Sequence, residues 1–380
     1  MRNNLFIILL GICCLHANAQ TVLYKSATLP RVGDEICKQE INYFSPGESG
    51  SGQIWQIEQL TPVKEHYELV YTGSDSLLIG TEHCTMYKYR IQGDSLWKVG
   101  VENRSTYQKA VFPELLAVYP MKLNDCFESL FGYIGEYQHA YGMELSGKTT
   151  VTADAEGVLV IEGDTIPDVL RIHTQRRFVQ DLDLHGAYHP AEDSAGWLCK
   201  FHPDSILSRI HADTLITQTD TYSWYVSGYR YPILETVENT LIRCGIHESH
   251  FRTAFYYSPS EQYYTLNEDT DNQQTREERS MQKQKKEEHS RSGSFPLGED
   301  GLGKCDFYQD DTHLIVEYLL TAPCEVEITL YTVQGELLTV YPKKEMRPGQ
   351  YRESVTIDPS LSRHYILRLV VNGKTYGEKI

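Results

Sequence analysis

The sequence predicts a mainly β protein, in which a large antiparallel β domain is followed by a small C-terminal Ig-like β-sandwich. Short runs of apolar, β-branched and aromatic residues recur along the chain, separated by Gly, Asp, Asn and Pro, as in all-β proteins. Regularly alternating helical segments, which a parallel α/β fold needs, are missing from the pattern. A chain of 380 residues with 41% hydrophobic content is also long enough for two or three domains.

The first 19 residues have the pattern of a secretory signal peptide. Arg2 precedes an apolar run from residue 5 to 15, and small residues follow up to Ala19. We therefore expect an exported protein that is cleaved between Ala19 and Gln20. The apolar run is shorter than the roughly 20 residues that a membrane-spanning helix needs. No later segment is long enough, so we expect no transmembrane segment in the mature chain.

Residues 20–266 are expected to form the large antiparallel β domain. Turn-forming residues at 92–94 and 154–157 predict hairpins between neighbouring strands. Local helical character is confined to 113–116 and 205–210. The strand candidates are 66–71, 76–80, 85–91, 95–99, 149–153, 158–161, 168–179, 214–225 and 233–238.

Residues 267–303 are expected to form a charged, disordered linker. The segment is rich in both charge signs and nearly devoid of apolar residues, so it has little surface to bury. Glu and Lys pairs three and four apart over 275–288 would stabilise a solvated helix there by only about 0.2–0.5 kcal/mol each.

Residues 304–380 are expected to form the β-sandwich. Apolar side chains alternate with polar ones at Val326, Ile328 and Leu330, and again over 365–371, as in strands that bury one face. Cys305 and Cys324 both lie in this unit. In an oxidising environment they are the pair that we expect to form a disulfide.

Three segments of the C-terminal unit also carry a family resemblance. They are Val326–Leu338, Gly349–Tyr351 and His364–Lys379. Together they resemble the type A C-terminal sorting domain of proteins exported by the type IX secretion system. The resemblance implies contact with the secretion machinery and a location in the periplasm, on the cell surface or outside the cell. The upstream region carries four shorter segments of a second resemblance, at 30–34, 47–55, 163–172 and 224–232. Through them it is similar to the body of secreted proteins that carry such tails.

The charge of the chain limits its partners. Its formal net charge is −17, which disfavours binding to nucleic acid and to anionic membrane surfaces. Phosphate-binding and dinucleotide-binding glycine motifs are missing from the sequence, so it predicts no cofactor.

One acidic loop carries candidate metal ligands. Asp181, Asp183 and Glu192 occupy positions 1, 3 and 12 of a calcium-loop spacing, with glycine at position 6. His185 and His189 are suitable ligands for Zn²⁺. Bound Ca²⁺ or Zn²⁺ and an acidic solvent loop without metal are therefore the alternatives for this loop.

Aromatic residues crowd one part of the β domain. Among 27 tyrosines, Tyr222, Tyr229 and Tyr231 lie close to Trp224 in the sequence. In a strand Tyr222 and Trp224 share one face. Such rings serve either in core packing or as a surface that binds glycan or protein.

The sequence thus favours an exported, non-catalytic binding or display protein of the cell envelope or extracellular space. The alternative is a secreted hydrolase that acts on peptide or glycan, with the His and carboxylate groups of residues 181–202 as its only candidates. The catalytic residues of such an enzyme remain unassigned.

Overall fold

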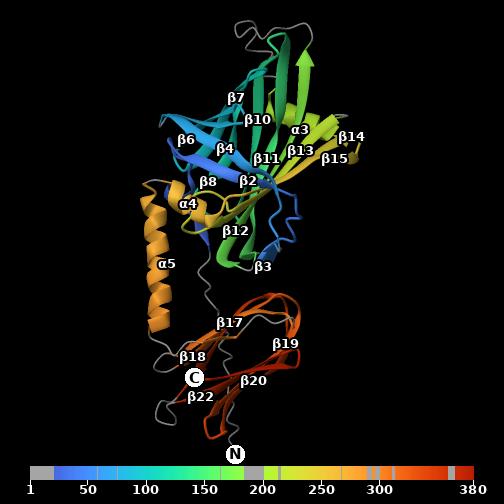
Figure 1. Ribbon diagram of the computed structural model, residues 1–380. Coiled ribbons are helices and arrows are strands. Elements are labelled where there is room, and N and C mark those ends of the chain that lie inside the picture. The colour runs from blue at the N-terminus through green and yellow to red at the C-terminus, as the bar shows by residue number, and fades with distance from the viewer. Residues whose placement is uncertain are drawn as a thin grey trace, which may run out of the picture.

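The computed structural model describes residues 21–57, 59–74, 76–162, 164–183, 201–212, 215–266, 268–288, 293–295, 300–309, 313–357 and 364–380. Within these ranges the protein is mainly β, as the sequence predicts. A large antiparallel sheet forms the upper part of the molecule in Figure 1, and the C-terminal strands form a smaller unit below it. The predicted cleavage site at Ala19 and Gln20 lies outside the described residues.

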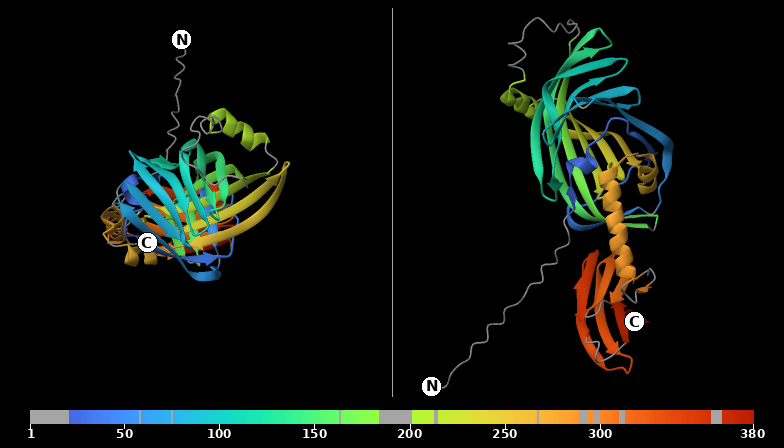
Figure 2. Two further views of the ribbon diagram at one scale, coloured as in Figure 1. Left: turned by 90° about the horizontal axis from the view of Figure 1, so that it is seen from above. Right: turned by 90° about the vertical axis from the view of Figure 1, so that its left-hand side faces the viewer.

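The large sheet closes on itself, because β10 pairs with both β8 and β11. Figure 2 shows its strands arranged around a central axis when seen from above. Around the closed sheet the order is β10 (Cys126–Tyr137), β8 (Thr106–Val118), β7 (Ser95–Glu102), β6 (Thr85–Gln92), β5 (Leu77–Glu82), β4 (Pro62–Ser74), β2 (Glu35–Ile41), β15 (Ile246–Tyr256), β14 (Leu234–Arg243), β13 (Leu215–Val226), β12 (Asp164–Asp183) and β11 (Tyr141–Ile161).

Closure gives each strand an inner and an outer face. The inner face is marked by contacts between strands that are not neighbours, such as the 2.8 Å bond from Arg176 Nε of β12 to Glu114 Oε1 of β8. Because side chains alternate along a strand, Arg171, His173 and Gln175 of β12 face outward. This outer face carries the candidate site described below.

Two further pairings extend the sheet system. β3 (Gly50–Ile57) runs parallel to the second half of β11. Gly157 of β11 permits this approach, because a Cβ atom there would collide with the backbone of Gln53. The short strands β1 (Val22–Leu23) and β9 (Met121–Lys122) pair with each other.

Of the four segments for which the sequence predicts a turn or a helix, two are confirmed and two are wrong. Residues 92–94 form the turn between β6 and β7, with Gly93 at a φ of 57°. Residues 154–157, predicted as a hairpin turn, lie inside β11 at irregularities of its pairing. Residues 113–116, predicted as helical, lie in β8, where pairing with β7 overrides local propensity. Residues 205–210 are helical, as predicted.

Helices cover parts of the closed sheet. α3 (Pro203–Ala212) buries Ile206 and Ile210, and Ile210 joins Val179 and Ile216 of the closed sheet in a small apolar cluster. The other helices among the described residues are α1 (Lys25–Thr28), α4 (Pro259–Thr265) and α5 (Thr270–Glu288). No helix of the described ranges is long and apolar enough to span a bilayer.

The segment that the sequence assigns to a disordered linker contains α5, which descends beside the closed sheet toward the C-terminal unit (Figures 1 and 2). Two arginines anchor it. Arg276 donates to Gly228 O at 2.6 Å, and Arg279 pairs with Asp168 at 2.7 Å. Asn272 is fully buried and donates to Ala27 O at 2.7 Å. These contacts come from residues distant in sequence, so local composition does not reveal them.

The C-terminal unit has two four-stranded sheets in the described residues. The first contains β16 (Gly293–Phe295), β17 (Leu302–Gln309), β18 (His313–Leu320) and β21 (Gly349–Thr356); the second contains β20 (Leu337–Met346), β19 (Cys324–Thr332), β22 (Tyr365–Val371) and β23 (Lys374–Lys379). Side chains of both sheets share one apolar core. Phe295 belongs to that core, so the unit begins before the predicted boundary at residue 304.

Cys305 and Cys324 do not form the predicted disulfide. Both are buried free thiols, and they belong to β17 and β19 of different sheets. Burial raises the pKa of Cys305 to about 12, so its thiol is neutral. Cys324 Sγ instead contacts Ala322 O at 3.1 Å.

Candidate functional site

A groove of about 540 Å³ lies on the outer face of strands β12 to β15, beside the segment that follows β2. We call it the outer-face groove. Its volume is within the range of roughly 300–1,000 Å³ that is typical of small-molecule sites. It is lined by Tyr43, Ser45, Pro46, His173, Gln175, Gln218, Asp220, Tyr222, Glu238 and Arg252.

Strand register brings these polar residues together. Asp220 of β13 lies opposite Gln175 of β12 on one side and Glu238 of β14 on the other. Arg252 of β15 continues this row beside Glu238. Directly opposed residues of antiparallel strands share a face, so four strands present one continuous polar row.

Asp220 is the centre of the row. Its carboxylate receives hydrogen bonds from Gln218 Nε2 at 2.7 Å and Gln175 Nε2 at 3.1 Å, and lies 2.9 Å from His173 Nε2. Burial acts to raise the pKa of Asp220, but the bonds from His173, Gln218 and Gln175 outweigh it and lower this pKa. Asp220 is therefore a fixed anion at the floor of the groove.

His173 and Tyr222 form a second row, one step along the same strands. Their rings stack in parallel with centroids 4.2 Å apart. The guanidinium of Arg171 lies 5.0 Å from the Tyr222 ring centroid. Burial and the negative charge of Asp220 raise the pKa of Tyr222, so its hydroxyl is neutral and able to donate a hydrogen bond.

Tyr43, Glu238 and Arg252 form the rim of the groove. Arg252 Nη2 lies 2.6 Å from Glu238 Oε1, and the Tyr43 hydroxyl donates to Glu238 Oε2 at 3.4 Å. The Arg252 guanidinium also lies 5.3 Å from the Tyr43 ring centroid. The arginine side chain is half exposed, so the rim is open to solvent on this side.

A buried arginine supports the groove from one end. Arg171 is 1% exposed, pairs with Asp154 at 2.7 Å, and donates to the backbone carbonyls of Pro46 and Glu48. Its guanidinium also lies near the rings of Trp55 and Trp224, at 5.5 and 5.8 Å. This arrangement fixes the segment that carries Ser45 and Pro46, which form one wall of the groove.

The four predicted ligand-binding residues have different environments. Tyr222 lines the groove, whereas Trp224 is fully buried beneath the Pro46 segment and packs on Phe44 and Trp55. Tyr231 is also buried, and its hydroxyl donates to Asp34 at 2.8 Å. Tyr229 lies against Arg276 of α5. These residues therefore do not form one exposed aromatic surface.

The predicted metal-binding loop is only partly described. Asp181 pairs with Arg209 of α3 at 2.5 Å, and Asp183 ends β12. His185, His189 and Glu192 lie outside the described residues. The described ranges contain no group of three or more suitable side chains placed to hold a metal ion.

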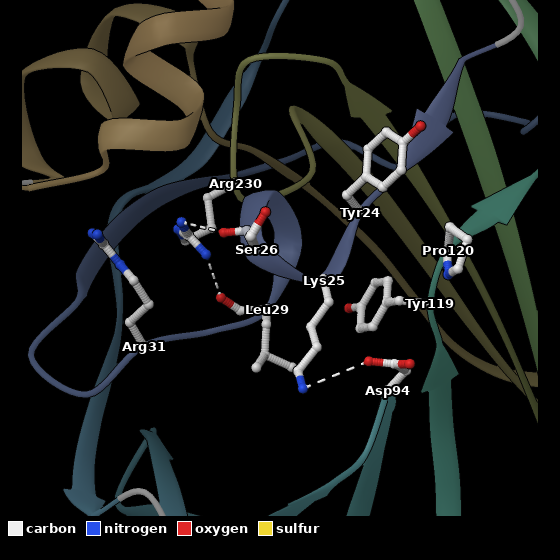
Figure 3. A pocket seen from close by; sticks show the side chains of 9 residues that line it. All are labelled: Tyr24, Lys25, Ser26, Leu29, Arg31, Asp94, Tyr119, Pro120 and Arg230. Atoms are coloured by element: carbon white, nitrogen blue, oxygen red, sulfur yellow. Dashed lines mark hydrogen bonds and ion pairs between the residues drawn. The ribbon is translucent and has the colours of Figure 1, made fainter.

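A second pocket, of about 500 Å³, lies beside α1 and the Tyr119–Pro120 segment (Figure 3). Its cationic side chains are occupied within the fold. Lys25 lies 3.8 Å from Asp94, and Arg230 donates to the backbone of Ser26 and Leu29. Arg31 pairs with Asp34. This pocket therefore presents fewer available polar groups than the outer-face groove.

No family model, curated protein or solved structure matches the chain. The case for a site therefore rests on its geometry. Sequence reasoning missed His173, Gln175, Gln218 and Asp220, although Gln218, Asp220 and Tyr222 at alternate positions are a visible signal of a hydrophilic strand face.

Proposed function

We propose that the protein is a non-catalytic binding protein whose outer-face groove takes a carbohydrate. The observation that carries this proposal is the polar row Gln175–Asp220–Glu238 with Tyr222 beside it. Sugar hydroxyls both donate and accept hydrogen bonds, and this row offers amide, carboxylate and phenol groups of both kinds. The fixed hydrogen bonds to Asp220 hold these groups in place before a ligand arrives.

The structure of the row favours binding over hydrolysis. A glycosidase needs one carboxylic acid with a raised pKa to protonate the leaving group. Asp220 has the opposite property, because its hydrogen bonds lower its pKa. Glu238 is engaged by Arg252. Among the described residues, His173 has no hydrogen bond to a serine or cysteine that would act as a nucleophile.

The hydrolase alternative remains a prediction from sequence. Its candidate groups belong to residues 181–202, most of which lie outside the described ranges. Binding of Ca²⁺ or Zn²⁺ at this loop is likewise a prediction from sequence. The groove supplies a more complete set of polar contacts than the described part of that loop.

We further propose that the protein is exported and that its C-terminal unit is an Ig-like sandwich acting as a type IX sorting domain. The two four-stranded sheets with a shared core support a sandwich. Contact with the secretion machinery is then transient, and the groove would meet surface glycans or glycoproteins after export.

The function is tested by probing an immobilised glycan panel with the purified mature chain and with Asp220→Asn. We expect defined glycans to retain the wild type. The variant should bind them at least about tenfold more weakly, because a charged hydrogen-bond centre is lost. Equal retention of both proteins, or of neither, would refute carbohydrate binding in this groove.

A further inference from the structure

A second polar cluster lies inside the closed sheet, on the face opposite to the groove. At its centre is Glu114 of β8, which contacts Lys98 Nζ of β7 at 2.6 Å and Arg176 Nε of β12 at 2.8 Å. Thr149 and Tyr133 also donate to this carboxylate, at 2.6 and 3.3 Å. These five residues, which we call the inner cluster, come from five different strands.

The inner cluster has more positive than negative charge. Lys98 and Arg176 share the single carboxylate of Glu114, and the two hydroxyl donors are neutral. Two further carboxylates, Glu235 and Glu82, are associated with Lys38 instead: Glu235 lies 3.8 Å from Lys38, whose charge also acts on Glu82. An uncompensated cation in a buried site is costly, so the cluster favours an additional anion.

Both cations keep some access to solvent. The side chain of Glu114 is 1% exposed, whereas those of Lys98 and Arg176 are 13% and 21% exposed although they lie inside the sheet. Within the described residues, the two terminal nitrogens of Arg176 have no hydrogen-bond partner. Arg176 therefore has donors left after its bond to Glu114.

The surroundings of the two cations are aromatic. The Arg176 guanidinium lies 4.4 Å from the ring centroids of both Phe131 and Phe178. Lys98 lies 5.8 Å from the ring centroid of Tyr133. A ligand here would combine a negatively charged group with an apolar body.

We propose that the interior of the closed sheet binds a monocarboxylate with an apolar body, whose carboxylate lies against Lys98 and Arg176. The two cations would neutralise the ligand, and the partly buried ring of Phe178 would contact its body. This site does not depend on the outer-face groove, because the two lie on opposite faces of β12.

The test is calorimetric titration of the full mature chain with benzoate and octanoate, and with benzamide as the neutral analogue. We expect saturable binding of at least one acid, and benzamide should bind at least about tenfold more weakly, since it lacks the charge. Failure of both acids to bind, or equal binding of benzamide, overturns the proposal.

Variants locate the site. Lys98→Met should weaken acid binding at least about tenfold, whereas Lys88→Met, which breaks a half-exposed ion pair with Glu102, should leave it unchanged. Unchanged binding in folded Lys98→Met overturns the proposal. If Lys98→Met does not fold, Glu114→Gln tests the proposal instead. Removal of the competing internal carboxylate should tighten acid binding. Unchanged or weaker binding in this variant overturns the proposal.

Discussion

His173 Nε2 lies 2.9 Å from Asp220 Oδ1, across the β12–β13 pairing and on the outer face of the closed sheet. The same histidine stacks on Tyr222. One imidazole therefore fixes both an anion and an aromatic hydroxyl group of the groove. A ligand would meet these groups already oriented, which lowers the entropy cost of binding.

The His173–Asp220 contact makes the histidine a positioning residue of the groove. His173→Phe keeps a ring that can stack on Tyr222 but removes the contact to Asp220, so glycan affinity should fall about tenfold. Titration calorimetry with a glycan retained by the wild type measures this loss. His247→Phe, at an exposed position of β15, is the matched control. An equal loss in both variants would contradict a specific role for His173.

Arg171 should be essential for stability. Arg171→Met leaves Asp154 and the Pro46 and Glu48 carbonyls without their buried partner, so we expect a loss of about 3–5 kcal/mol in the free energy of unfolding. Urea unfolding followed by tryptophan fluorescence measures it. Arg243→Met removes an exposed, 4.0 Å ion pair and should cost less than about 1 kcal/mol. Similar losses in the two variants would show that Arg171 does not hold the groove wall.

Glu114 should make the fold sensitive to acid. Burial acts to raise its pKa, but Arg176 and Lys98 lower it to about 2, from an ordinary value of 4.5. The unfolded chain then binds more protons between these values, so this stabilisation is present above about pH 4.5 and is lost as the pH falls toward 2. Unfolding by urea at a series of pH values should show this slope, and Glu114→Gln should reduce it. An unchanged slope in the variant would exclude Glu114 as a source of the pH dependence of stability.

The anchoring of α5 predicts a change in proteolysis. The double variant Arg276→Ala and Arg279→Ala removes bonds to Gly228 O, Ser227 O and Asp168. The helix should then be cleaved faster by Glu-C, a protease that does not cleave at arginine. Gln273→Ala with Gln274→Ala, which affects only contacts within the helix, is the control. Equal cleavage of the two variants would mean that the arginines do not hold α5.

Local patterns predict eight of the twelve strands of the closed sheet but not their closure. The β-rich run over 214–225 identifies β13 almost to its ends, whereas the run over 168–179 identifies only the middle of β12, which spans Asp164–Asp183. The pairing of β10 with β11, which closes the sheet, depends on contacts that local sequence does not encode. For the same reason local composition predicts a linker where α5 forms, since its anchors Arg276 and Arg279 bind carbonyls about 50 residues earlier.

The site was only partly predictable. Alternation places Tyr222 and Trp224 on one face, and the structure agrees, since both lie near Arg171. Their different exposure is set by the segment before Pro46: Phe44, more than 170 residues away in sequence, packs on Trp224, whereas Tyr222 lines the groove. Sequence periodicity carries no information about such a cover.

The most direct test of carbohydrate binding is a titration of the purified protein with a glycan selected from the panel, beside two double variants. Gln175→Ala with Gln218→Ala removes amides from the groove, and Gln273→Ala with Gln274→Ala removes amides from the exposed surface of α5. We predict that the groove double variant shows no measurable glycan binding and that the α5 double variant binds the glycan with unchanged affinity. Wild-type affinity in the groove variant would contradict the assignment of the groove as the binding site.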